Sequence, residues 1–347
     1  MDPQSALPPI EPGASPQPVV SQNIGPQSPQ PSTLRKVFTG KEGLRAGWSA
    51  IVFILIFAGF MGAVVFVTLK FVPGSGRAKN VGDISLKLAY VNEGLATVGV
   101  LLATWLMAKI ERRGRNYGYG GAHKLVLFAG GIVSGVILIS LLVFTLYKGG
   151  LLVVQGRLMF GGDVARYGIL WLVAFVFAGV FEESLTRGFL LYTLARGFSG
   201  LYRWLFRTRH STALGFWTAA VILSVIFFLG HTNNPGESPV GLLSVFLAGM
   251  FFSLSVWWTG SVWWGIGMHA AWDWGQSFLF GVADSGIMFQ HHLLATHPQG
   301  KPILSGGTTG PEGSIFVLAV LALGSLMIIF TLPKGRYLEA PPEDPLP

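Results

Sequence analysis

The chain has 347 residues, of which 51% are hydrophobic and 12% are charged, and it contains no cysteine. Soluble domains carry roughly 25% charged residues, so this composition excludes a soluble globular protein and indicates an integral membrane protein. The lack of cysteine excludes disulfides, thiolate metal sites and a thiol nucleophile, and we interpret the net charge of +8 as a sign of membrane topology and not of nucleic-acid binding.

The chain begins with a polar stretch. Residues 1–32 are rich in Pro, Ser, Gln and Gly and have too little apolar content to form a core, which predicts a disordered tail. Residues 33–46 form a basic juxtamembrane segment, which is either an amphipathic stretch on the anionic inner leaflet or a solvated flank of the first span. The first apolar run does not have the form of a cleavable signal peptide, so we expect it to be retained as an anchor.

Apolar runs of roughly 20 residues, the length that crosses a hydrocarbon core of about 30 Å, recur along the chain. They lie at about 47–70, 84–108, 124–147, 168–195, 213–231, 239–258, 261–281 and 313–332. These runs predict an all-α fold, a polytopic membrane bundle of about eight helices over residues 47–332, followed by a C-terminal tail at 333–347. The glycines of AGGIVSGV in the third run are expected to let helices approach closely.

Basic residues are unevenly distributed between the polar connections. With a cytoplasmic N-terminus, the segments on the inner side hold more Lys and Arg than the outer loops do. This bias predicts a multi-pass membrane protein with both termini in the cytoplasm.

Several titratable residues fall inside apolar runs, where a charge costs roughly 2.5–3.5 kcal/mol and must face a protected interior. They are Glu93, Glu182, Glu183, Arg187, His231, His269 and Asp273. All except Glu93 lie in three runs of the C-terminal half. The sequence suggests no partner for Glu93.

Helical spacing separates the two adjacent glutamates. Glu183 and Arg187 are four residues apart, with the acid first, so they share a helix face and can form an ion pair. Glu182 is turned from Glu183 by about 100° on a helix of 3.6 residues per turn. It therefore lacks that partner and is the better candidate for chemistry.

Histidines occur in two of the later runs. His231 ends the fifth run, ahead of an Asn-Asn-Pro-Gly turn, where it could also be a satisfied interface residue. His269 and Asp273 are four residues apart and share a helix face, which suits two ligands of one metal ion or a pair that orients and stabilises a reacting oxygen. Together with Glu182, these side chains form a set able to polarise a water away from bulk solvent.

Three motifs follow one another on successive apolar runs: Glu182-Glu183-x-x-x-Arg187, Phe227-x-x-x-His231 and His269-x-x-x-Asp273. This series resembles the CAAX protease and bacteriocin-processing (CPBP) family of intramembrane proteases, which includes the CAAX prenyl endopeptidases. The flanking stretches EESLTRGFLLYTL, HTNNP and TGSVWWGIGMHAAWDW look like those of bacterial members, which implies a bacterial cell membrane. The resemblance covers roughly residues 168–281, the expected catalytic core.

The resemblance implies an endopeptidase that hydrolyses a peptide bond of a membrane-associated or CAAX-like peptide or membrane protein. In that mechanism Glu182 activates the attacking water, His231 assists, and His269 with Asp273 holds the oxyanion or a metal. Glu183, Arg187 and Phe227 would support the site. If a metal is bound, Zn²⁺ is the candidate, with Glu182, His231, His269 and Asp273 as ligands. Because the flanking motifs look bacterial, an unprenylated substrate is expected.

The chain departs from the eukaryotic prenyl-protease pattern at position 273, which is Asn there and Asp here. An ionised Asp cannot donate a hydrogen bond to an oxyanion. Asp273 must therefore be protonated through burial, orient His269, or ligate a metal.

Two other functions account for intramembrane acids and histidines. An ion-coupled transporter would use them as a proton relay, and it predicts inverted repeats with broken helices, a pairing that this sequence does not show. A non-catalytic scaffold or immunity protein of the same fold would tolerate loss of Glu182, His231 or His269. The intact set favours the protease.

Overall fold

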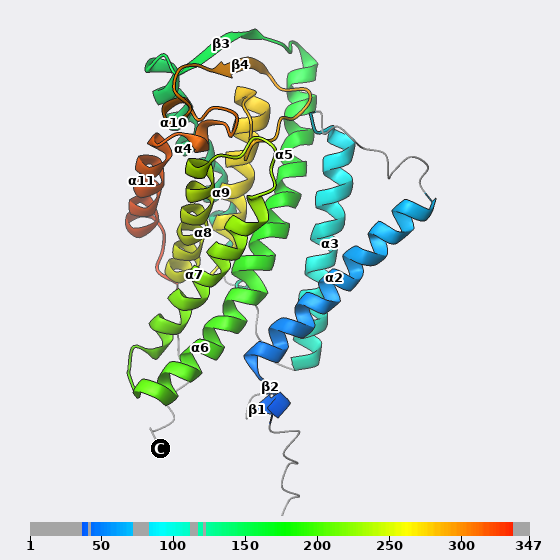
Figure 1. Cartoon of the computed structure of the whole chain (residues 1–347), viewed down its shortest axis with the longest axis vertical. Helices are drawn as coiled ribbons and strands as arrows, with labels where there is room; N and C mark the ends of the chain where they lie inside the picture. The colour runs from blue at the N-terminus through cyan, green and yellow to red at the C-terminus, as the bar shows by residue number, and fades with distance from the viewer. Residues whose placement is uncertain (1–36, 41–42, 72–82, 112–116, 121–122, 336–347) are drawn as a thin grey trace, which may run out of the picture.

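The computed structural model describes residues 37–40, 43–71, 83–111, 117–120 and 123–335. The predicted disordered tail at 1–32 lies outside the described residues, as do parts of the 33–46 segment and residues 336–347 of the predicted C-terminal tail. Within the described part the chain forms a bundle of long helices (Figure 1), which confirms the predicted helical membrane bundle.

The helices follow the order of the apolar runs. They are α2 (Ala46–Phe71), α3 (Leu86–Glu111), α4 (Lys124–Lys148), α5 (Gly162–Glu183), α6 (Leu191–Phe206), α7 (Ser211–His231), α8 (Pro239–Thr259), α9 (Trp263–Trp274), α10 (Pro302–Ser305) and α11 (Phe316–Thr331). π-Helical turns at Ser184–Leu190 and Gly275–Phe280 follow α5 and α9, and a 3₁₀ turn occupies Pro311–Gly313.

In the described residues, six helical stretches are long and apolar enough to cross a membrane. The fourth of them, Gly162–Phe206, is 45 residues long because α5, the π-helical turn and α6 are continuous, so it extends beyond the predicted 168–195 run at both ends. The seventh predicted run is the 12-residue α9 with its π-helical turn, and the eighth is the 16-residue α11. Both are shorter than the predicted spans, and the chain is a multi-pass membrane protein.

Two short antiparallel ribbons were not predicted. β1 (Thr39–Gly40) pairs with β2 (Gly43–Leu44), and β3 (Leu152–Arg157) pairs with β4 (Leu294–Pro298). The longer ribbon covers the end of the bundle opposite the start of α2 (Figure 1). Its strands lie far apart in the sequence and follow no clear alternation of apolar and polar residues, so no local pattern indicates them.

Helix α9 packs against α4 and α5 at positions where glycine leaves room for its backbone. A Cβ atom on Gly131 or Gly135 of α4 would collide with backbone atoms of α9, and one on Gly179 of α5 would lie 2.9 Å from the carbonyl oxygen of Ile266. This close approach confirms the expectation for the glycines of the third run. It also places the helix that carries His269 and Asp273 beside α5.

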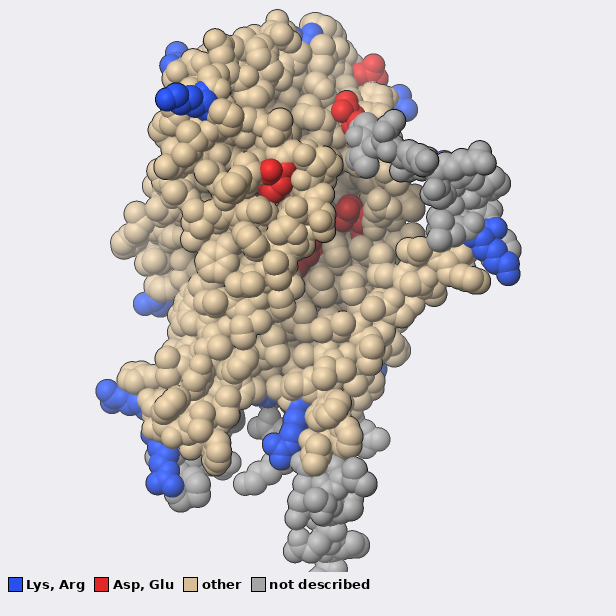
Figure 2. Space-filling view, in the orientation of Figure 1, with Lys and Arg blue, Asp and Glu red and all other residues tan. Residues whose placement is uncertain are grey.

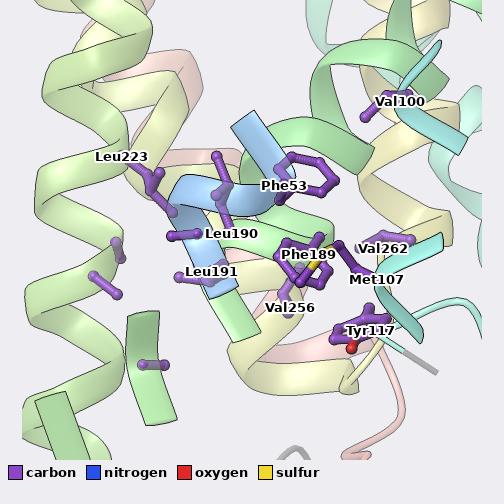
Figure 3. Packing of buried hydrophobic residues seen from close by; sticks show 14 of the residues in the cluster. Phe53, Val100, Met107, Tyr117, Phe189, Leu190, Leu191, Leu223, Val256 and Val262 are labelled. Atoms are coloured by element: carbon purple, nitrogen blue, oxygen red, sulfur yellow. The ribbon is translucent and has the colours of Figure 1, made fainter. Parts of the chain in front are cut away.

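A hydrophobic cluster joins the N-terminal helices to the segment that follows Glu183 (Figure 3). Phe53 of α2 stacks on Phe189 with ring centroids 4.4 Å apart, and Tyr117 packs against the same ring at 4.8 Å. Phe189 belongs to the π-helical turn Ser184–Leu190. Packing from α2 therefore supports the turn next to the glutamates.

Candidate active site

The two glutamates are the last residues of α5, directly before the π-helical turn Ser184–Leu190. Inside that turn Gly188 departs from helical geometry, with φ −82° and ψ −113°. π-Helical turns occur frequently at functional sites, because the extra residue changes the direction of neighbouring side chains. Asp273 likewise lies just before the π-helical turn Gly275–Phe280.

Glu183 and Arg187 form the predicted ion pair. Nη1 of Arg187 lies 3.1 Å from Oε1 of Glu183, and the side chains of both residues are only 1% exposed. The same nitrogen donates a hydrogen bond of 2.8 Å to Oγ1 of Thr186. The pair is therefore wholly buried, so each charge depends on the other.

His269 of α9 contacts the glutamates at the end of α5, which belongs to the fourth span. Its Nδ1 lies 3.1 Å from Oε1 of Glu183, and because a carboxylate only accepts, this nitrogen donates the hydrogen bond. Its Nε2 lies 3.7 Å from Oε2 of Glu182 and 3.6 Å from Oδ2 of Asp273. Three carboxylates thus surround one imidazole, and the expected shared face of His269 and Asp273 is present.

His231 stands apart from this group. It ends α7, and the turn predicted behind it is present, because the Asn234 amide donates to the His231 carbonyl oxygen at 3.1 Å. Its Nδ1 lies 2.8 Å from the carbonyl oxygen of Phe227, and its ring contacts the Phe227 ring edge-on at 4.6 Å. Within the described residues no hydrogen bond or ion pair links His231 to Glu182, His269 or Asp273.

A cavity of about 400 Å³ lies between His231 and the side chains around His269. Glu182, His231, His269 and Asp273 all lie on its wall, and so does Glu93 of α3, for which the sequence suggested no partner. Apolar and aromatic side chains complete the lining, from α5, α7, α8, α9 and α11 among others. Figure 2 shows acidic side chains gathered around a hollow on this face of the molecule.

Two further acids on the cavity wall escaped sequence analysis. Asp284 accepts hydrogen bonds from Nε2 of Gln276 at 3.3 Å and from Oγ of Ser277 at 3.2 Å, and Glu312 accepts one from the amide of Ser285. Burial and, to a lesser extent, the charge of Asp273 raise the pKa of Asp284, and burial together with Asp284 raises the pKa of Glu312 to about 8. In the sequence each of them is an isolated acid in a neutral loop, and nothing else there indicates a functional role.

Aromatic rings surround the Glu183, Arg187 and His269 side chains. The guanidinium carbon of Arg187 lies 4.6 Å from the ring centroid of Phe227 and 5.4 Å from that of Phe252. Phe227 was expected to support the site. Phe252 was not singled out, because nothing in the sequence distinguishes it from the other aromatic residues of α8.

The donor atoms of the site are of the types that zinc accepts. Among the residues that the structure describes, however, no three His, Asp or Glu side chains are grouped closely enough to hold one metal ion. Zinc binding therefore stays a prediction from the sequence, and the proposed steps use side chains of this chain alone.

The motif-bearing segment also matches a known family. Residues 165–275, from α5 to the first residue after α9, match the family model described as type II CAAX prenyl endopeptidase Rce1-like. No curated protein and no solved structure is similar enough to the chain to count as a match. The matched segment holds Glu182, His231, His269 and Asp273, which line the cavity, and also the buried Glu183–Arg187 pair. The chain therefore contains an Rce1-like domain at residues 165–275, and this match supports the resemblance to the CAAX protease and bacteriocin-processing family.

Proposed function

We propose that the chain is an endopeptidase in which Glu182 activates a water molecule to attack a peptide bond of a membrane-associated substrate. The Rce1-like domain makes it a CAAX-type intramembrane protease in general terms. The observation that supports the finer assignment is that Glu182, His269 and Asp273 meet on the wall of one cavity inside the helix bundle.

Glu182 is the proposed general base. Its side chain is 27% exposed, and its Oε2 accepts no hydrogen bond within the described residues. Glu183 differs, because its charge is already matched by Arg187. In the proposed step Glu182 removes a proton from water as the oxygen bonds to the substrate carbonyl carbon. It then returns that proton to the amide nitrogen as the carbon–nitrogen bond breaks.

His269 is the proposed stabiliser of the oxyanion. Glu183 holds its Nδ1, so its Nε2 is directed toward the part of the cavity shared by Glu182 and Asp273. With a proton on each ring nitrogen, His269 donates from Nε2 to the developing oxyanion. Of the roles open to Asp273, the 3.6 Å contact with Nε2 favours orientation of the imidazole.

His231 has an assisting role in this proposal. It lies on the same cavity wall as Glu182 but is joined to the Phe227 carbonyl instead of to the carboxylates. That placement suits a contact with the substrate or the leaving group. The substrate class is proposed from the sequence as an unprenylated peptide or membrane protein.

The test compares conservative variants of two acids, one on the cavity wall and one outside it, in purified protein with a reporter peptide. Glu182→Gln should lower kcat by about 10²–10⁴, the usual contribution of a general base, without changing the thermal unfolding midpoint. Glu237→Gln is a matched control, because Glu237 lies outside the cavity wall and contacts the backbone amide of Ser238. Full activity of Glu182→Gln would refute the assignment of the base. A wild-type protein that cleaves no peptide of a broad panel would favour the non-catalytic scaffold.

A further inference from the structure

Phe252 of α8 contacts two of the three side chains in the buried Glu183 network. Its ring stacks on the His269 imidazole, with centroids 5.0 Å apart and planes inclined by 22°. The same ring lies 5.4 Å from the guanidinium carbon of Arg187, and Phe252 is only 5% exposed. The Phe252 ring therefore contacts both partners of Glu183.

Phe227 of α7 supplies a second ring to the same network. It lies 4.6 Å from the Arg187 guanidinium carbon and contacts His269 edge-on at 6.3 Å. Nη2 of Arg187 has no hydrogen-bond partner within the described residues. The electron-rich faces of the two rings compensate part of the cost of burying that cation.

The hydrogen bond to Glu183 restrains His269 at one atom only. A ring held at Nδ1 can still pivot about that contact, and a small rotation would move Nε2 away from Glu182 and Asp273. A nearly parallel aromatic face restrains the plane of the imidazole, because stacked rings lose contact when one of them tilts. Misplacement by about 1 Å can cost a reaction about 10²-fold in rate.

We infer that Phe252 is a positioning residue for catalysis, which holds the plane of the His269 imidazole so that Nε2 faces the reacting oxygen. This inference rests on the function proposed above. It assigns a role to α8, a helix in which the sequence motifs place no functional residue.

Phe251 provides a matched control on the same helix. It is 4% exposed, against 5% for Phe252, and both line the cavity. Phe251 packs on Trp264 with ring centroids 5.6 Å apart, and in the described structure no ring contact joins it to His269. A substitution of either residue by Leu removes a similar amount of buried aromatic surface, but only one removes the face against the imidazole.

The experiment uses full-length Phe252→Leu, Phe251→Leu and Phe252→Tyr proteins in detergent micelles. The first readout is the NMR signal of the His269 ring carbons and protons, assigned by its loss in His269→Ala. Stacking shifts these protons upfield, so Phe252→Leu should move them downfield, whereas Phe251→Leu and Phe252→Tyr should leave them near the wild-type position. The second readout is peptide cleavage, in which Phe252→Leu should lower kcat about tenfold while KM stays within about twofold. Phe252→Tyr keeps the aromatic ring, so its kcat should stay near the wild-type value.

Equal effects of the two Leu variants on both readouts would overturn the inference and leave Phe252 as a core residue. A downfield shift in Phe252→Leu with unchanged kcat would also overturn it, because the imidazole plane would then not matter for catalysis. The NMR readout needs no activity, so a wild-type protein that cleaves nothing would refute the proposed function while the ring position is still measured.

Discussion

Replacing Glu183 by Gln should destabilise the bundle and slow catalysis, whereas replacing Glu183 and Arg187 together should cost less stability than the two single replacements summed, without restoring activity. The reason lies in the two contacts of Glu183. One of its oxygens pairs with Arg187 at 3.1 Å and is also the acceptor for Nδ1 of His269. The first contact neutralises a buried charge, and the second orients a group at the cavity.

The magnitude follows from burial. Both side chains of the pair are 1% exposed, so removal of one partner leaves an uncompensated buried charge, at a cost of about 3–5 kcal/mol. The stability loss of Glu183→Gln should lie near the lower end of this range, because the amide oxygen can still accept a hydrogen bond from His269. Arg187→Met should cost a similar amount. The double variant contains neither charge, so we expect its loss of unfolding free energy to be about 2–3 kcal/mol smaller than the sum of the losses of the two single variants.

The assay is a double-mutant cycle on wild type, both single variants and the double variant in detergent micelles. Denaturant unfolding gives the four stabilities, and reporter cleavage gives the four values of kcat. Additive stabilities would refute the buried ion pair. Recovery of wild-type kcat in the double variant would refute the orientation of His269 by the Glu183 charge.

Two further predictions concern pH and metal. The pKa of Glu312 rises from an ordinary 4.5 to about 8 through burial, so between these values the unfolded state binds fewer protons and stability falls as pH rises. Thermal unfolding of Glu312→Gln should lose part of that pH dependence, and unchanged curves would contradict the burial of a neutral carboxyl. If side chains alone activate the water, cleavage should persist after chelation and dialysis; loss of activity together with stoichiometric zinc in the purified protein would replace this mechanism by a metalloprotease.

Neighbours along one helix were predictable. The apolar runs have the length that a bilayer requires, and six of the helices meet that length. The pairing of Glu183 with Arg187 and the shared face of His269 and Asp273 follow from a spacing of four residues, which brings side chains together on any helix.

Contacts between helices were not predictable in the same way. The contact of Glu183 with His269 joins residues 86 positions apart, and it depends on the glycines that let α9 approach α4 and α5. Sequence spacing paired Glu183 with Arg187 only. The tertiary structure adds His269, the proposed stabiliser of the oxyanion, as a second partner, because the π-helical turn and the packing of α9 decide where each side chain points.

The amino-acid sequence by itself thus determined the membrane bundle, the order of the motifs and the ion pair within one helix, since each depends on hydrophobicity and local helical geometry. Only the tertiary structure decided that Glu93, Asp284 and Glu312 share the cavity with Glu182, and that Phe252, not Phe251, faces His269. Those distinctions depend on how each helix is rotated against its neighbours, and that rotation is set by close packing between helices and not by the pattern along any one of them.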